Sequence, residues 1–177
     1  MENRIAKFEK VTFVNFEKAW RDTVPRDIRG EDYSLTQIID IYNNLKKPVR
    51  ATSGSAGYDI FAPIDIKLLP GETICFPTGI RCKIEPDWFM GVFPRSGLGF
   101  KYALRLNNTV GIIDSDYYFS DNEGHIFVKL INDSSLCKKV EIKQGEGVTQ
   151  AIFLPFGITV DDKCEATRNG GFGSTTK

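Results

Sequence analysis

The chain has 177 residues, of which 41% are hydrophobic and 26% are charged, with 23 basic and 23 acidic side chains. This length and composition are typical of one globular domain, and the balanced charge leaves no broad basic field to attract nucleic acid. No apolar run approaches the roughly 20 residues that span a bilayer, and the N-terminus lacks the apolar core of a signal peptide. We therefore expect a cytoplasmic protein that binds neither membranes nor nucleic acid.

The four cysteines, Cys75, Cys82, Cys137 and Cys164, form no C-x-x-C pair, and His125 is the single histidine of the chain. A structural zinc site needs closely spaced sets of such ligands, so this pattern argues against one. Because nothing in the sequence indicates secretion, the cysteines are predicted to be reduced thiols.

Helical periodicity is confined to the first 50 residues. Ser34 is a suitable N-cap for a helix, and Gln37, three residues later, completes a capping box. We expect this helix to end before Pro48, because the residue that precedes a proline disfavours the helical conformation. A weaker pattern around Phe16 and Trp20 predicts an earlier helix. The apolar positions of the stronger helix are Leu35, Ile38, Ile39, Tyr42 and Leu45.

From Arg50 onward, short strand-like runs alternate with turns that contain glycine or proline, which is typical of a β-sandwich or barrel. We expect a single domain over residues 1–177, with an N-terminal helical extension (1–50), a β core (51–163) and a C-terminal arm (164–177). The extension is too short to bury a core of its own. The predicted strands are Ile64–Leu68, Thr73–Phe76, Ile80–Ile84, Trp88–Phe93, Ile126–Ile131, Val140–Ile142 and Val148–Leu154.

Two acidic residues follow an apolar run. Val110, Ile112 and Ile113 precede Asp114 and Asp116, which predicts a buried strand that carries the acids at its end. A carboxylate held there can take a proton from water as a general base. Read in isolation, the Asp-Ser-Asp sequence is more typical of an acidic turn between strands.

Two further segments are candidates for binding phosphate. Arg95-Ser96-Gly97 offers a guanidinium fork, a hydroxyl and a close backbone approach, although the tripeptide alone also fits a solvated surface turn. The last ten residues contain three glycines around Phe172. Termini are often disordered, but an aromatic side chain in such a tail favours a lid that orders over a ligand.

Five patches occur in a fixed order: Ser55–Asp59, Pro94–Gly97, Gly111–Tyr117, Gly147–Gln150 and Arg168–Thr175. Together they resemble the homotrimeric dUTP pyrophosphatase (dUTPase) family from about Ala51 to the C-terminus. The resemblance implies a mainly β, distorted jelly-roll (a dUTPase-like β-clip) with a mobile C-terminal arm. It also implies a Mg²⁺-dependent enzyme that hydrolyses dUTP to dUMP and pyrophosphate in active sites shared within a homotrimer. Such an enzyme limits uracil incorporation into DNA and supplies dUMP for dTMP synthesis.

The resemblance assigns catalytic roles to three residues. Asp114 matches the aspartate that orients the attacking water, and Ser96 matches a serine near the scissile α–β bridge. Gln150 matches a glutamine that approaches the phosphates or the neighbouring subunit. Asn108 matches the residue that reads the pyrimidine edge, and Tyr117 matches the ring that packs under deoxyribose. The substrate-binding set is Arg95, Ser96, Gly97, Asn108, Gly111, Ile113, Asp114, Tyr117, Gln150, Arg168, Phe172, Gly173 and Ser174.

Asp59 is expected either to hold waters around a metal ion or to brace the tail arginine, Arg168. Magnesium prefers phosphate oxygens and water to a cage of protein ligands, which agrees with the lack of a His/Cys cluster in the sequence. The chain departs from the family pattern by an insertion at residues 118–123, and neither its role nor that of residues 1–50 can be inferred from the sequence.

Three alternatives remain. A dCTP deaminase of the same fold would need a glutamate at the position of Lys129, and a lysine cannot replace that carboxylate. A nucleotide-sensing or regulatory protein without catalysis would be expected to lack Asp114 or the tail motif, and both are present. A nucleic-acid-binding β-barrel is disfavoured by the neutral charge.

Overall fold

The structure, a computed structural model, describes residues 4–24, 26, 30–166 and 168. The chain begins with β1 (Ala6–Lys10), α1 (Phe13–Thr23) and α2 (Leu35–Asn44). The β core then contains β2 (Val49–Arg50), β3 (Tyr58–Phe61), β4 (Ile66–Leu68), β5 (Thr73–Pro77), β6 (Ile80–Ile84), β7 (Trp88–Pro94), β8 (Leu104–Leu106), β9 (Gly111–Ile113), β10 (Phe127–Asn132), β11 (Val140–Ile142) and β12 (Gly147–Pro155). Two short helices interrupt it, α3 (Ser96–Tyr102) and the 3₁₀ helix η1 (Ser115–Phe119).

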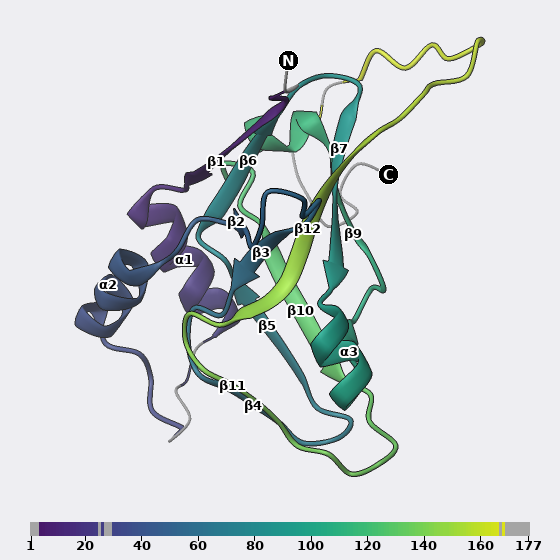
Figure 1. Cartoon of the computed structure of the whole chain (residues 1–177). Helices are drawn as coiled ribbons and strands as arrows, with labels where there is room; N and C mark the ends of the chain where they lie inside the picture. Colours follow the sequence, from purple (N-terminus) through teal and green to yellow (C-terminus); the bar gives the residue numbers. More distant parts are fainter. Residues whose placement is uncertain (1–3, 25, 27–29, 167, 169–177) are drawn as a thin grey trace.

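The largest sheet has the strand order β2-β3-β12-β7-β9, and a second sheet has the order β5-β10-β8. The remaining pairs, β1-β6 and β11-β4, complete the pairing of the named strands in the described part of the chain. These ladders are antiparallel, and their elongated arrangement is visible in Figure 1. The prediction of a mainly β, distorted jelly-roll is confirmed.

Both predicted helices are present. The Ser34 hydroxyl accepts from the Gln37 amide while the Gln37 side chain accepts from the Ser34 amide, so the capping box forms as predicted. Strand β1 was not predicted, because alternation between Ala6 and Lys10 is weak in apolar residues. It pairs along the whole of β6 and thereby joins the N-terminal segment to the β core.

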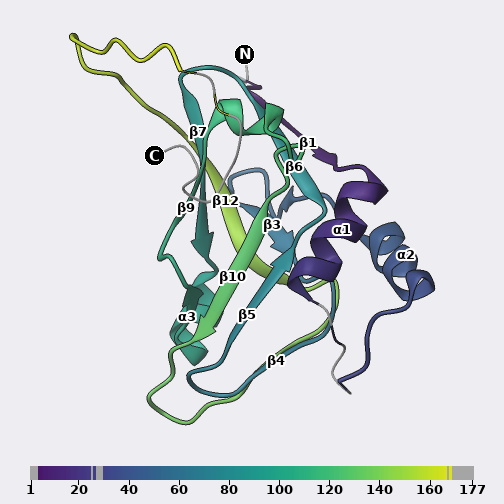
Figure 2. The same cartoon turned by 180° about the vertical axis from the view of Figure 1, so that it is seen from behind.

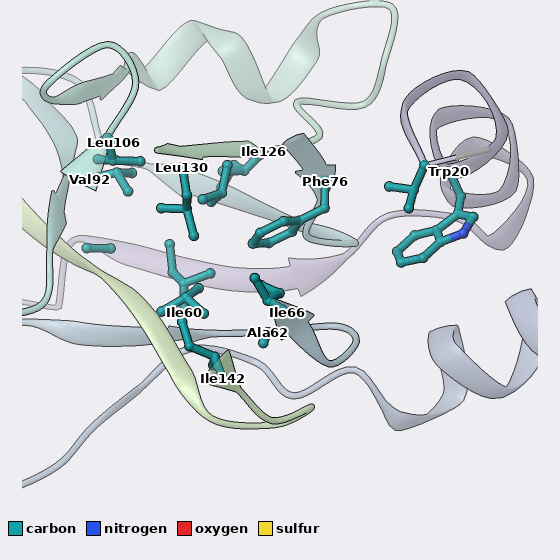
Figure 3. Packing of buried hydrophobic residues seen from close by; sticks show 14 of the residues in the cluster. Trp20, Ile60, Ala62, Ile66, Phe76, Val92, Leu106, Ile126, Leu130 and Ile142 are labelled. Atoms are coloured by element: carbon teal, nitrogen blue, oxygen red, sulfur yellow. The ribbon is translucent and has the colours of Figure 1, made fainter. Parts of the chain in front are cut away.

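The hydrophobic core lies between the sheets and continues under α1. Phe76, Val128 and Leu130 are fully or almost fully buried, as are Phe16 and Trp20 of α1. Figure 3 shows Phe76 and Leu130 facing Ile60 and Ile66, with Trp20 at the α1 end of the cluster. Helix α1 therefore packs as part of the core.

Residues 156–166, which we call the projecting segment, behave differently. They leave the end of β12 and extend beyond the body of the molecule, as both views show (Figures 1 and 2). Phe156, Ile158 and Val160 are exposed along this segment. In the described residues, no helix is long and apolar enough to cross a membrane.

Candidate active site

The two acids after β9 stand on an edge, because β9 is the last strand of the five-stranded sheet and pairs with β7 alone. Ile112 is 55% exposed, so the prediction of a buried strand is wrong in this respect. Side chains alternate along a strand, so Ile112 points to the face opposite that of Gly111 and Ile113, and that face is exposed. Asp114 occupies the N-cap position of η1 without a capping hydrogen bond from its side chain, and this short helix places Asp114 and Asp116 at the surface.

Arg168 binds both acids. Its Nη2 pairs with Asp114 Oδ2, and its Nε lies 2.9 Å from Asp116 Oδ1. The guanidinium also lies 5.9 Å from the centre of the Tyr117 ring. The structure thus brings the tail arginine, which is distant in sequence, to the predicted catalytic carboxylate. One of the two expectations for Asp59 was a contact with Arg168. Asp59 pairs instead with Arg95.

Tyr117 is anchored inside the loop. Only 6% of the residue is exposed, and its hydroxyl donates to the His125 carbonyl over 2.7 Å while accepting from Asn122 Nδ2 over 2.8 Å. Burial raises the pKa of this phenol. The structure leaves little of the ring open to a sugar, and the ring stiffens the loop that follows Asp114.

The insertion after Tyr117 is held by the N-terminal segment, which the sequence did not indicate. Glu123 accepts from both the amide and the hydroxyl of Thr12, over 2.8 and 2.6 Å. The Tyr118 hydroxyl donates to Glu9 over 2.6 Å, and the Arg81 guanidinium lies 4.3 Å from the centre of the Tyr118 ring. Hydrogen bonds from Lys7 and Tyr118 lower the pKa of Glu9 to about 2.

Gly124 closes the insertion because it tolerates a left-handed conformation. Its φ is +67°, and a Cβ there would lie 2.7 Å from Tyr118 Cα and 2.8 Å from the Tyr117 carbonyl oxygen. A side chain at this position would therefore push the loop open.

Two pockets in the described part of the chain are lined by predicted site residues. The first lies beside β9 and has a volume of about 260 Å³. Of the predicted substrate-binding residues, Asn108, Gly111 and Ile113 line it. Because the family resemblance predicts that Asn108 reads the pyrimidine edge, we call it the base pocket. Six further residues that sequence reasoning did not assign to binding also line it: Cys75, Val92, Leu106, Asn107, Phe127 and Lys129. The register between β5 and β10 brings Cys75 opposite Lys129, and this pairing was not visible in the sequence.

The second pocket, of about 540 Å³, is lined by residues from three of the sequence patches. Because Arg95 and Ser96 are predicted to bind phosphate, we call it the phosphate pocket. Asp59 lies at one side, and Arg95, Ser96 and Gly97 form the start of α3 at another. Gln150 completes the lining from β12. The β3–β12 ladder explains the meeting, because it pairs Gln150 directly with Asp59.

Contacts within the phosphate pocket fix its two main donors. Arg95 Nε pairs with Asp59 Oδ1 over 3.1 Å, and Arg95 Nη1 donates to the Gly147 carbonyl over 2.9 Å. The side-chain amide of Gln150 donates to the Pro94 carbonyl over 3.0 Å. A Cβ at Gly57 would lie 2.5 Å from Gln150 Oε1, so a side chain there would displace this side-chain amide. Asp59 therefore orients the arginine.

The two pockets share no lining residue. Ser96 and Gln150 line the phosphate pocket, whereas Asp114 follows Ile113 at the base pocket. One chain thus does not gather the three predicted catalytic residues around a single cavity. Phe172, Gly173 and Ser174 lie outside the described residues.

Within the described residues, no group of three or more His, Cys, Asp or Glu side chains is arranged to hold a metal ion. A magnesium ion at the phosphate pocket would fit if phosphate oxygens and water supplied most of its ligands, as this ion prefers. Asp59 is the carboxylate that lines this pocket.

Comparison with known proteins agrees with these features. The sequence model of the dUTPase family matches residues 43–176. A deoxyuridine 5'-triphosphate nucleotidohydrolase of Lactococcus lactis is 38% identical over 144 residues, which cover 78% of this chain and 95% of the relative. One of Psychromonas ingrahamii is 41% identical over 138 residues, covering 73% of this chain and 87% of the relative.

Solved structures give the same result. The crystal structure of a dUTPase from Streptococcus mutans superposes with a TM-score of 0.57 at 35% identity, covering 66% of this chain and 90% of that one. The dUTPase of Staphylococcus bacteriophage 80alpha superposes with a TM-score of 0.57 at 22% identity, covering 71% and 93%, and supports the fold.

Proposed function

This chain belongs to the dUTPase family, and we propose on that basis that it hydrolyses dUTP to dUMP and pyrophosphate. The observation that carries the proposal is the phosphate pocket: three patches far apart in sequence supply Asp59, Arg95, Ser96 and Gln150 to one cavity. A triphosphate carries nearly four negative charges, and a guanidinium with a fixed orientation is suited to bind it.

In the proposed reaction, the Asp114 carboxylate takes a proton from a water molecule, and the water oxygen attacks the α-phosphorus. The bond between that phosphorus and the α–β bridging oxygen breaks, and pyrophosphate leaves. Arg95, Ser96 and Gln150 hold the phosphates, and bound Mg²⁺ would neutralise charge on their oxygens. Asn108 holds the pyrimidine edge. Arg168 has to exchange its bonds to Asp114 and Asp116 for the phosphates before Asp114 can act as the base.

We further propose that the active enzyme is a homotrimer with shared sites. Two observations support self-association. The base and phosphate pockets are separate within one chain, and the projecting segment exposes Phe156, Ile158 and Val160, which a second copy would cover. Sedimentation at micromolar concentration should give three times the mass of one chain. A stable, active monomer would contradict this proposal.

Such an enzyme would limit uracil incorporation into DNA and supply dUMP for dTMP synthesis, and a cytoplasmic location remains a prediction. Substrate choice is tested by mixing the protein with dUTP, dCTP, UTP or dTTP and Mg²⁺ and detecting pyrophosphate. Release of pyrophosphate from dUTP is expected. Release of ammonia from dCTP would instead support the deaminase alternative, and binding without turnover would support a sensor.

The role of Asp114 is tested by Asp114→Asn. Loss of a general base is expected to lower kcat by about 10²–10⁴-fold while nucleotide binding persists. Asp121→Asn is the matched control, since it makes the same change at an exposed position of the following loop. Full activity of Asp114→Asn would contradict the assignment, as would an equal loss in the control.

A further inference from the structure

One charged side chain lines the base pocket among the described residues, and it is Lys129. Along β10, Val128 and Leu130 point into the core and are almost completely buried, so Lys129 points to the opposite, pocket-lining side. The backbone N–H of Asn107 donates to the Lys129 carbonyl over 2.9 Å. This bond fixes Lys129 beside the turn that carries Asn108.

The ammonium group of Lys129 lacks an acceptor in the described part of the chain, where it forms neither an ion pair nor a hydrogen bond. No described carboxylate lines the pocket. Cys75 lies opposite on β5, and burial raises the pKa of its thiol, so that it stays neutral. An ammonium carries three donors and no acceptor. A ligand in this pocket would therefore meet a group that can only donate.

Asn108, the residue expected to read the base, cannot choose between pyrimidines by itself. Its side chain is exposed, and none of the described residues makes a hydrogen bond that would fix the direction of its amide. An amide has a donor and an acceptor, and rotation by half a turn exchanges them. It can therefore satisfy uracil in one orientation and cytosine in the other. Among the side chains that line the pocket, discrimination needs a group whose polarity cannot be reversed.

We propose that Lys129 selects the base, its ammonium donating a hydrogen bond to the 4-oxo oxygen of uracil. Cytosine carries a 4-amino group at this position, which is a donor and would face the ammonium without a hydrogen bond. Lys129 is then a specificity-determining residue for the base. The inference rests on the proposed function and deepens it by naming the residue that excludes dCTP.

The experiment compares kcat/KM for dUTP, dCTP and dTTP in wild type, Lys129→Met and Lys129→Gln. Methionine keeps the length of the side chain and removes its donors, and glutamine adds an acceptor. Loss of a hydrogen bond to a charged group should lower the preference for dUTP over dCTP by about 10–100-fold. The ratio of dUTP to dTTP should stay within about twofold, because thymine carries the same 4-oxo oxygen.

Lys67→Met is the matched control, since Lys67 is an exposed lysine on β4 that lines neither pocket. It should leave all three rates unchanged. Direct binding of dUMP and dCMP provides a readout that does not depend on turnover, and Lys129→Met should narrow the difference between the two dissociation constants.

An unchanged ratio of dUTP to dCTP in both Lys129 variants would overturn the inference. So would an equal loss for all three nucleotides, because that pattern belongs to a lysine that binds phosphate. These results are distinct from failure of the proposed function, in which the wild-type protein would release no pyrophosphate from dUTP.

Discussion

Helix α1 and the projecting segment both carry large apolar side chains, but α1 buries them and the projecting segment leaves them exposed. In α1, Phe16 and Trp20 are completely buried, with ring centres 5.4 Å apart. In the projecting segment, Phe156 is 45% exposed, Ile158 is 74% exposed and Val160 is fully exposed. Helix α1 completes the core of its own chain, whereas the projecting segment leaves its apolar side chains exposed. In the proposed trimer, a second copy of the chain would cover them.

The family match begins at residue 43, so α1 lies outside the matched region and the projecting segment lies inside it. The segment before that limit is closely integrated: β1 pairs along β6, and Thr12 binds Glu123 in the insertion after Tyr117. Two departures from the family pattern, the N-terminal segment and the insertion, therefore contact each other. Each supplies hydrogen-bond partners to the other.

The largest expected effect on the single chain comes from removing the α1 anchor. Trp20→Ala should lower the free energy of unfolding by about 3–5 kcal/mol, because it removes a completely buried indole and leaves a cavity. Urea unfolding measures the change. Val14→Ala on the same helix, at a position that is 76% exposed, should change stability by about 0.5 kcal/mol or less. Equal effects of the two substitutions would show that α1 does not belong to the core.

The next effect is a pH dependence at His125, whose ring lies 6.2 Å from that of Phe16. Burial lowers the pKa of His125 from 6.5 to about 4. The unfolded chain then binds a proton that the folded chain does not, so this stability is complete above pH 6.5 and is lost as the pH falls toward 4. The loss should reach about 3 kcal/mol.

The test measures the free energy of unfolding of wild type and His125→Gln between pH 6.5 and 4.5. The contribution of His125 is the difference between the two slopes of free energy against pH. Glu9 does not disturb this window, because its lowered pKa affects stability only as the pH falls through the range from 4.5 to about 2. Parallel curves for the two proteins would mean that the N-terminal helices leave His125 accessible to water.

A smaller effect is expected where the N-terminal segment binds the insertion. Partial burial disfavours the charge of Glu123, yet the hydrogen bonds from Thr12 prevail and lower its pKa. Glu123→Ala should cost about 1–2 kcal/mol, since it leaves the Thr12 amide without this partner. Glu123→Gln retains an acceptor and should cost less. The double variant with Thr12→Ala, which removes the hydroxyl and keeps the amide, should show coupling in a thermodynamic cycle, and strict additivity would exclude the hydroxyl contact.

The smallest effect on the single chain should come from the projecting segment. Replacing Ile158 and Val160 together by serine removes side chains that bury little within their own chain, so the pair should change monomer stability by about 0.5 kcal/mol or less. The same variant should dissociate at higher protein concentration in sedimentation. An unaltered assembly would contradict the proposed role of this segment, and a strongly destabilised monomer would contradict the comparison itself.

Local elements were predictable because their signals are local. The capping box of Ser34 and Gln37 formed as expected, and β6 and β11 begin and end at the predicted residues. Helix α3 was not predicted, because Gly97 and Gly99 are poor helix formers and suggested a turn. Strand β1 was missed because its pairing with β6, rather than its own composition, stabilises it.

The sequence by itself determined the order of the five patches, and with it the family and the expected chemistry. Only the tertiary structure decided which patches meet. Gln150 reaches Asp59 because β12 pairs with β3, and Lys129 reaches the base pocket because of its place on β10. It also buried Tyr117 and bound Arg168 to Asp114. Strand register and long-range packing depend on interactions between residues far apart in the chain, and short motifs do not encode them.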